Sequence, residues 1–223
     1  MRLLQICLCI LFLGAAAAAP ARGHGHGHRN ESGPASAGFD YYLMSLSWSP
    51  SFCLTHPDVT EQCGSKGFGF VLHGLWPQNS NGTWPQHCRS TEHPDAATIE
   101  HTLAFMPSRH LVEHEWETHG TCSGLDPQAY FALADRAFAA VKIPPALRAP
   151  QISPTLSASD LVDAFVAVNP GLSDNMLSVD CHNGAQLSEV RICLDRNTLA
   201  PRACGGRVRN TCRLGNLTIP AVR

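Results

Sequence analysis

The chain has 223 residues, of which 44% are apolar and only 15% are charged. This length suffices for one well-buried domain and is short for two, and the composition excludes a disordered chain. A formal net charge of −2 excludes a protein that coats nucleic acid through a broad basic field, although a cleft that holds a few nucleotides stays possible.

Residues 1–19 have the three parts of a secretory signal peptide. Arg2 supplies the positive start, residues 3–13 the apolar core and Ala17–Ala19 the small-residue cleavage site. The apolar run is short for a bilayer span, which argues against a retained anchor, and no later segment is apolar enough to cross a membrane. We therefore expect a secreted or periplasmic protein with no membrane partner.

Residues 20–38 are rich in Gly, Ser, Ala and His and have no apolar period, which predicts a disordered tail. Its alternating histidines, His24, His26 and His28, could bind a metal ion loosely, but a solvated tail is the favoured interpretation. Residues 39–223 then form the single predicted domain.

The cysteines support the expectation of export. Cys7 and Cys9 lie in the predicted signal peptide, and an even set of eight remains. In an exported chain such a set implies disulfide bonds, but spacing alone does not choose their pairing. The lack of any C-x-x-C pair argues against the alternative, a zinc site. The eight are Cys53, Cys63, Cys88, Cys122, Cys181, Cys193, Cys204 and Cys212.

Hydrophobic patterning predicts four strands. Residues 39–48 alternate, and residues 67–75 form a second short strand that ends where Trp76-Pro77 turns the chain. Residues 175–181 and 189–195 are the third and fourth. The apolar residues expected on one side of the first strand are Tyr42, Met44, Leu46 and Trp48.

Two helices are predicted between the second and third strands. Asp126 can cap one, with Pro127 in its first turn. Ser157, with Asp160 three residues later, opens the other, which closes at Pro170-Gly171. The apolar residues of the first follow the helical period: Tyr130, Leu133, Phe138 and Val141. Helices and strands mix without a regular βαβ rhythm, which predicts an α+β fold.

Two short windows gather side chains that transfer protons or stack on rings. The first, GFVLHGLWPQ, contains His73, and the second, EHEWETHGTC, contains His114 and His119. If the second window is helical, residues four apart share a face and Glu115 stands beside His119. A carboxylate next to an imidazole holds its orientation and raises its pKa, which suits a proton-transfer group.

The second window also invites comparison with zinc proteases. Those enzymes place two histidines four residues apart, in H-E-x-x-H, on one helical face. Here His114 and His119 are five apart, which turns the two rings away from each other. This spacing argues against a metalloprotease site. The first window has a weaker signal, because a single histidine at a strand end is more often structural.

Taken together, the windows resemble a known family. The run HGLWP from His73, followed by HEWETHGTC from His114, resembles the two active-site segments of the ribonuclease T2 family, which are secreted endoribonucleases. The segment SWSPSFC and the cysteine pattern extend the resemblance over most of residues 39–212. It implies one disulfide-bonded α+β domain with a central antiparallel sheet packed with helices.

The resemblance also implies an activity. A monomer would cleave single-stranded RNA, and not DNA, without a metal or other cofactor. His73 and His119 would be the acid–base pair, Glu115 a helper near the phosphate, and His114 a phosphate-binding cation. One imidazole would take the proton of the ribose 2′-hydroxyl and the other would protonate the departing 5′-oxygen, giving a 2′,3′-cyclic phosphate and then a 3′-phosphate. By family analogy His119 is the base and His73 the acid.

Other site residues follow from the same resemblance. Thr118 stands where the family commonly has a lysine, so its hydroxyl would contact the phosphate without a charge and turnover would be slower. Trp76 and Trp84 would flank the base on the 5′ side of the cut. Gln78 replaces an aspartate that contacts the base in some relatives, which implies a base preference that is either broad or shifted, and we expect low base specificity.

The implied disulfides are Cys53–Cys63, Cys88–Cys122, Cys181–Cys212 and Cys193–Cys204. Two rival functions stay open: a non-catalytic relative that binds RNA or a protein, and a secreted metalloenzyme that uses the histidine-rich tail. The remaining histidines carry no motif and are expected to be surface or structural residues: His56, His87, His93, His101, His110 and His182.

Overall fold

The computed structural model describes residues 38–213 and 215–223. The predicted signal peptide and all of the predicted tail except Gly38 lie outside the described residues. The elements are, in chain order, β1 (Tyr41–Trp48), α1 (Ser49–Thr55), β2 (Phe70–Gln78), α2 (Ala96–Thr102), α3 (Arg109–Thr118), η1 (Gly120–Cys122), α4 (Pro127–Ala140), η2 (Pro145–Leu147), α5 (Ala158–Val168), η3 (Asp174–Met176), β3 (Leu177–His182) and β4 (Gln186–Asp195).

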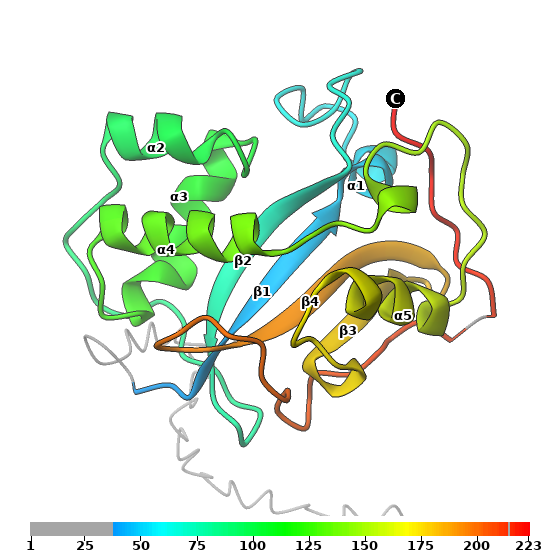
Figure 1. Cartoon of the computed structure of the whole chain (residues 1–223). Coiled ribbons are helices and arrows are strands. Elements are labelled where there is room, and N and C mark those ends of the chain that lie inside the picture. Colours follow the sequence, from blue (N-terminus) through cyan, green and yellow to red (C-terminus); the bar gives the residue numbers. More distant parts are fainter. Residues whose placement is uncertain (1–37, 214) are drawn as a thin grey trace, which may run out of the picture. The chain divides into compact units, whose positions relative to one another are not determined.

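The four strands form one antiparallel sheet in the order β2-β1-β4-β3 (Figure 1). The α+β class and the central antiparallel sheet predicted above are confirmed. The predicted end of the second strand is wrong, because β2 continues through Trp76 and Pro77 to Gln78. Proline is tolerated there because β2 is an edge strand, where a missing N–H need not cost a ladder hydrogen bond.

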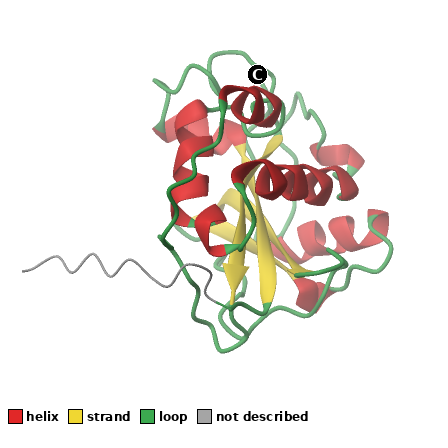
Figure 2. Ribbon diagram, turned by 90° about the vertical axis from the view of Figure 1, so that its left-hand side faces the viewer, coloured by secondary structure: helices red, strands yellow, loops and turns green. Residues whose placement is uncertain are grey.

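The hydrophobic core lies on one face of this sheet. Tyr42, Met44, Leu46 and Trp48 of β1 are buried in it, as predicted, and at most 2% of each residue is exposed. Helices α2, α3 and α4 lie beside β2, and α5 lies against the β3–β4 end of the sheet (Figure 1; Figure 2). The other face carries a smaller buried cluster of Tyr41, Leu43 and Cys193, and the rest of that face is open to other side chains.

Both predicted helices are present with their caps. Asp126 accepts a hydrogen bond from the Ala129 N–H at the start of α4. Ser157 and Asp160 form the full capping box of α5. Each such cap satisfies N–H groups that the first turn leaves unpaired.

Sequence patterning missed α1 and α2. Each has seven residues, too few for a helical period to emerge, and each is supported by contacts outside itself. The Cys53–Cys63 bond ties α1 to the following loop. Asp95 caps α2 by accepting from the Thr98 N–H.

The structure contains four disulfides, and their pairing is the one implied by the family resemblance: Cys53–Cys63, Cys88–Cys122, Cys181–Cys212 and Cys193–Cys204. Cys88–Cys122 joins the loop after β2 to η1, which directly follows α3. Within the described part of the chain, none of the helices is long and apolar enough to span a bilayer.

Candidate active site

A β-bulge places His73 in the site. Ser45 of β1 pairs with Gly74 and Leu46 pairs with Leu72, so His73 is an extra residue in β2. The bulge shifts the alternation of the strand. Leu72 and Leu75 both pack in the core, while His73 contacts side chains on the opposite face of the sheet.

Glu115 reaches β2 from α3. Its carboxylate accepts a 2.7 Å hydrogen bond from Trp76 Nε1, and its other oxygen lies 3.6 Å from His73 Nε2. A Cβ atom on Gly74 would lie 2.1 Å from both the carboxylate oxygen and the indole nitrogen, so only glycine permits this approach. Burial raises the pKa of Glu115 to about 7, although the charge of His73 and the Trp76 hydrogen bond oppose the rise.

The predicted pairing of Glu115 with His119 is wrong. The helix ends at Thr118, and His119 is its C-cap with φ −121° and ψ −45°, so the four-residue helical spacing does not extend to its side chain. The Glu115 carboxylate instead faces His73. Burial, followed by the charges of His114 and His73, lowers the pKa of His119 to about 3, opposite to the predicted direction.

Trp76 connects the two imidazoles. The centroid of its ring lies 5.2 Å from that of His73 and 5.3 Å from that of His119. The Nδ1 atom of His119 is buried and has no hydrogen-bond partner among the described residues, which leaves Nε2 as the nitrogen available to a ligand. The structure thus brings His73, Glu115 and His119 around one indole.

Two charged residues of β4 complete the site, and the sequence analysis missed both. Glu189 lies 2.5 Å from His73 Nδ1 through one oxygen, and its other oxygen accepts from Arg191 at 2.8 Å. The guanidinium of Arg191 lies 5.7 Å from the centre of the Trp76 ring. The sequence contained a signal for these two residues, because opposite charges alternate with Val190 and Ile192 in a predicted strand. Unpaired charges inside a sheet are costly, so such a pattern indicates that the charges have partners.

Four other residues that the sequence analysis assigned to the site make no contact with the two imidazoles through a hydrogen bond or ion pair among the described residues. The hydroxyl of Thr118 is buried and lacks a partner among the described residues, and Gln78 is buried at the end of β2. Trp84 is about half exposed, and its indole donates to Gln86. His114 is exposed on α3, and partial burial and the charge of His73 lower its pKa.

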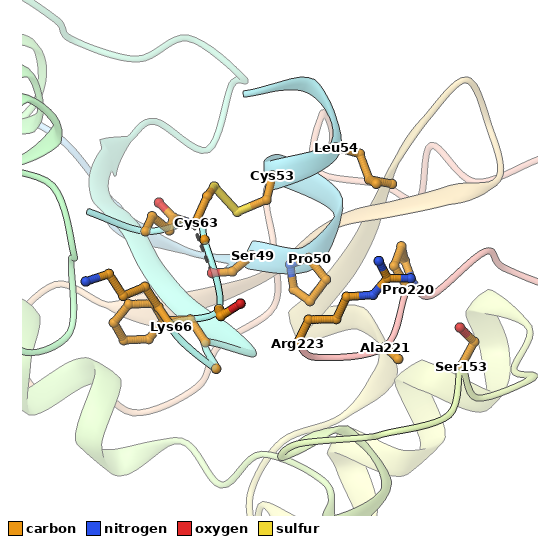
Figure 3. A pocket seen from close by; sticks show the side chains of 15 residues that line it. Ser49, Pro50, Cys53, Leu54, Cys63, Lys66, Ser153, Pro220, Ala221 and Arg223 are labelled. Atoms are coloured by element: carbon orange, nitrogen blue, oxygen red, sulfur yellow. Dashed lines mark hydrogen bonds between the residues drawn. A yellow bond between two sulfur atoms is a disulfide. The ribbon is translucent and has the colours of Figure 1, made fainter. Parts of the chain in front are cut away.

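Two cavities flank α1. One, of about 350 Å³, opens beside His73 and is also lined by His114, Leu111 and Phe52. The other, of about 380 Å³, lies on the side of α1 that carries Ser49 and Pro50, and Figure 3 shows Lys66 and Arg223 at it. No histidine lines this second cavity among the described residues, so the acid–base groups belong to the first.

The chain is similar in sequence to known ribonucleases. The model of the ribonuclease T2 family matches residues 39–204. A ribonuclease of Aeromonas hydrophila is 50% identical over 96 residues, which are 43% of each chain. A probable ribonuclease of Haemophilus influenzae is 33% identical over 73% of this chain and 60% of its own length. The chain thus spans less than two thirds of each of these relatives.

Solved structures agree on the fold. An RNase-related protein from Calystegia sepium superposes with a TM-score of 0.67 at 22% identity, over 84% of this chain and all of its own. A mutant of RNase MC1, an enzyme from bitter gourd seeds, in complex with 5′-GMP has a TM-score of 0.56 at 25% identity, over 81% of this chain and all of its own. The chain belongs to the ribonuclease T2 family.

Proposed function

We propose that the chain is an exported endoribonuclease that cleaves single-stranded RNA by attack of the ribose 2′-hydroxyl on the adjacent phosphorus. The observation that carries this proposal is the pair of imidazoles around Trp76, which have opposite surroundings. Two carboxylates face His73, whereas burial and neighbouring histidines act on His119. One group is thus suited to give a proton and the other to take one.

In the first step His119 takes the 2′-hydroxyl proton as the 2′-oxygen forms a bond to phosphorus. The bond from phosphorus to the 5′-oxygen breaks, and that oxygen keeps the electron pair and receives a proton from His73 Nε2. The product is a 2′,3′-cyclic phosphate. Water then attacks it with the roles of the imidazoles reversed, which leaves a 3′-phosphate. Each positioned proton transfer contributes on the order of 10²–10⁴-fold in rate.

Glu115 and His114 would act on the phosphate. Glu115, with its pKa raised to about 7, can donate a hydrogen bond when protonated, so it need not repel the anion. His114 lines the cavity beside His73 and would contribute positive charge when protonated. We also retain the proposal that Thr118 meets the phosphate, which requires its enclosed hydroxyl to become accessible.

The base-binding part of the proposal rests on aromatic surfaces. Trp76 is half-buried beside both imidazoles, and the half-exposed Trp84 would cover the other side of a base. Stacking tolerates every base, which favours low specificity. Gln78 would contribute only a neutral amide. The cavity beside His73 would receive the nucleotide across the scissile bond.

Related proteins support the substrate class and the export. A mutant of RNase MC1 was solved with bound 5′-GMP, and a relative from Solanum lycopersicum that is 27% identical is an extracellular ribonuclease. Together with the four disulfides, these names favour a secreted or periplasmic protein. We propose that it acts as a monomer.

Digestion of single-stranded RNA in EDTA tests the proposal. We expect chains that end in 2′,3′-cyclic phosphate early and in 3′-phosphate later, identified by mass, and no cleavage of single-stranded DNA. DNA lacks the attacking hydroxyl and thus serves as the substrate control. Cleavage that occurs without EDTA and is lost in EDTA would favour the metalloenzyme rival. RNA binding without cleavage, with or without EDTA, would favour the non-catalytic relative.

Thr118→Lys is expected to raise kcat/KM at low ionic strength. A lysine there would add a positive charge near the phosphate, and salt would screen the gain. The measurement is the initial rate on a dinucleotide at several salt concentrations, with Thr121→Lys in η1 as the matched control. A rate for Thr118→Lys no higher than that of the control at low salt would contradict the expectation.

A further inference from the structure

The side of His73 away from Glu115 carries a row of buried and partly buried charges to which the steps proposed above assign no separate task. Glu189 lies in β4, a central strand, where only 9% of its side chain is exposed. One carboxylate oxygen meets His73 Nδ1 at 2.5 Å. The other accepts from Arg191, and Arg191 in turn lies 3.4 Å from Asp180 of β3.

We propose that Glu189 is the positioning residue of His73, holding its Nδ1 so that Nε2 faces the scissile phosphate and keeping the imidazole protonated until it gives its proton to the leaving 5′-oxygen. This inference rests on the proposed function, because it takes His73 to be the acid that protonates the 5′-oxygen. Glu189 touches the imidazole and not the reacting atoms.

Geometry supports a positioning role. An imidazole whose Nδ1 is bound by a carboxylate has its ring plane and its tautomer set, so the neutral form carries the proton on Nδ1 and leaves Nε2 free. The carboxylate is itself held on both sides, by His73 and by Arg191. The bulge in β2 is what brings His73 within reach of β4 across β1.

Charge supports it as well. Glu189 and Arg191 from β4 and Glu115 from α3 act on His73. The charge of His73 in turn lowers the pKa of His114 on α3 and of His119 just after it. Burial alone would lower the pKa of His73, but the hydrogen bond and charge of Glu189, with help from Glu115, raise it above its usual value.

The pKa of Glu189 completes the electrostatic argument. Burial would raise it, yet the hydrogen bond and charge of His73 and the charge of Arg191 lower it to about 2. Glu189 thus stays ionised at every pH at which His119 is an available base, and its negative charge favours the protonated form of His73.

The test is Glu189→Gln, which keeps a hydrogen-bonding side chain of the same length and removes the charge. At a pH below the His73 pKa of the variant, His73 is protonated in both proteins, so their kcat/KM values should approach each other. As the pH rises above that pKa, His73 loses its proton in the variant before it does so in the wild type. The ratio of wild-type to variant kcat/KM should therefore grow. An opposite charge shifts a pKa by about 1–3 units, so we expect at least a roughly tenfold ratio at alkaline pH.

Two further variants sharpen the result. Asp135→Asn removes the carboxylate of another histidine pair, His101–Asp135 at 3.1 Å on the surface, and should leave the pH profile unchanged. Glu189→Asp keeps a carboxylate and should restore part of the alkaline activity. A loss of activity in Glu189→Gln that is the same at every pH would show a merely structural role and overturn the inference.

An NMR titration of the imidazoles keeps the inference testable if Glu189→Gln does not fold or the wild type cleaves no RNA. In the wild type, the His73 signals should titrate above 6.5 and show the Nδ1–H tautomer when neutral. A lower pKa or the Nε2–H tautomer would overturn the assignment of Glu189. Absence of cleavage with the expected titration would instead reject the proposed function and leave the His73–Glu189 contact standing.

Discussion

Replacing His119 with alanine is expected to lower kcat/KM on single-stranded RNA by about 10²- to 10⁴-fold, the contribution of one positioned proton transfer. The physical reason is that the pKa values of the two imidazoles shift in opposite directions, so His73 is poorly suited to replace His119 as the base. Burial keeps the His119 imidazole neutral down to a pKa of about 3, whereas Glu189 and Glu115 raise the pKa of His73 above its usual value. Initial rates at neutral pH would measure the effect, together with hydrolysis of a 2′,3′-cyclic nucleotide, which should fall as well.

His101→Ala is the control for this prediction. His101 is exposed and pairs with Asp135 on the surface, so its removal should change neither rate. The His119→Ala protein should keep its fold, because the buried Nδ1 of His119 makes no hydrogen bond within the described part of the chain. Near-normal cleavage by a folded His119→Ala protein would refute the assignment of His119 as the base.

Gly74→Ala is expected to remove most activity and to lower the free energy of unfolding by about 1–3 kcal/mol, the usual cost of overpacking a filled interior. The added methyl would lie 2.1 Å from a Glu115 oxygen and from Trp76 Nε1, so the hydrogen bond between them must break or α3 must move. Either change displaces Glu115 and the ring that joins the two imidazoles. Denaturant unfolding and RNA cleavage would measure the two effects.

Gly206→Ala is the matched control for the added methyl. A Cβ at Gly206 meets no atom within 4 Å, and its backbone conformation is one that alanine adopts, so stability should change little. If Gly74→Ala were as stable and active as Gly206→Ala, the close approach of α3 to β2 would not be required for the site.

Local patterns were sufficient for several features. Alternation placed Tyr42 and Met44 in the core, and the Ser157–Asp160 capping box set the start of α5. These features depend on neighbouring residues in one element, so their physics is contained in a short stretch of chain. The short α1 and α2 could not be found in this way, because seven residues show too little periodicity and depend on a disulfide or a single cap.

The family motifs named His73, Glu115 and His119, and the disulfide pairing that the family implies is the one in the structure. The sequence did not reveal which carboxylate lies beside which imidazole. A helical reading put Glu115 beside His119, but the helix ends one residue too early for that pairing. The partner of Glu115 is His73, which is 42 residues away in the chain and is placed by a bulge.

The sequence by itself determined the family, the core pattern and the residue types of the site, because these depend on short-range spacing. Only the tertiary structure decided the electrostatics. Glu189 acts on His73 from 116 residues away, through the pairing of β2 and β4 with β1. A pKa depends on burial and on charges within a few ångströms, and those distances exist only once the sheet and α3 have packed together.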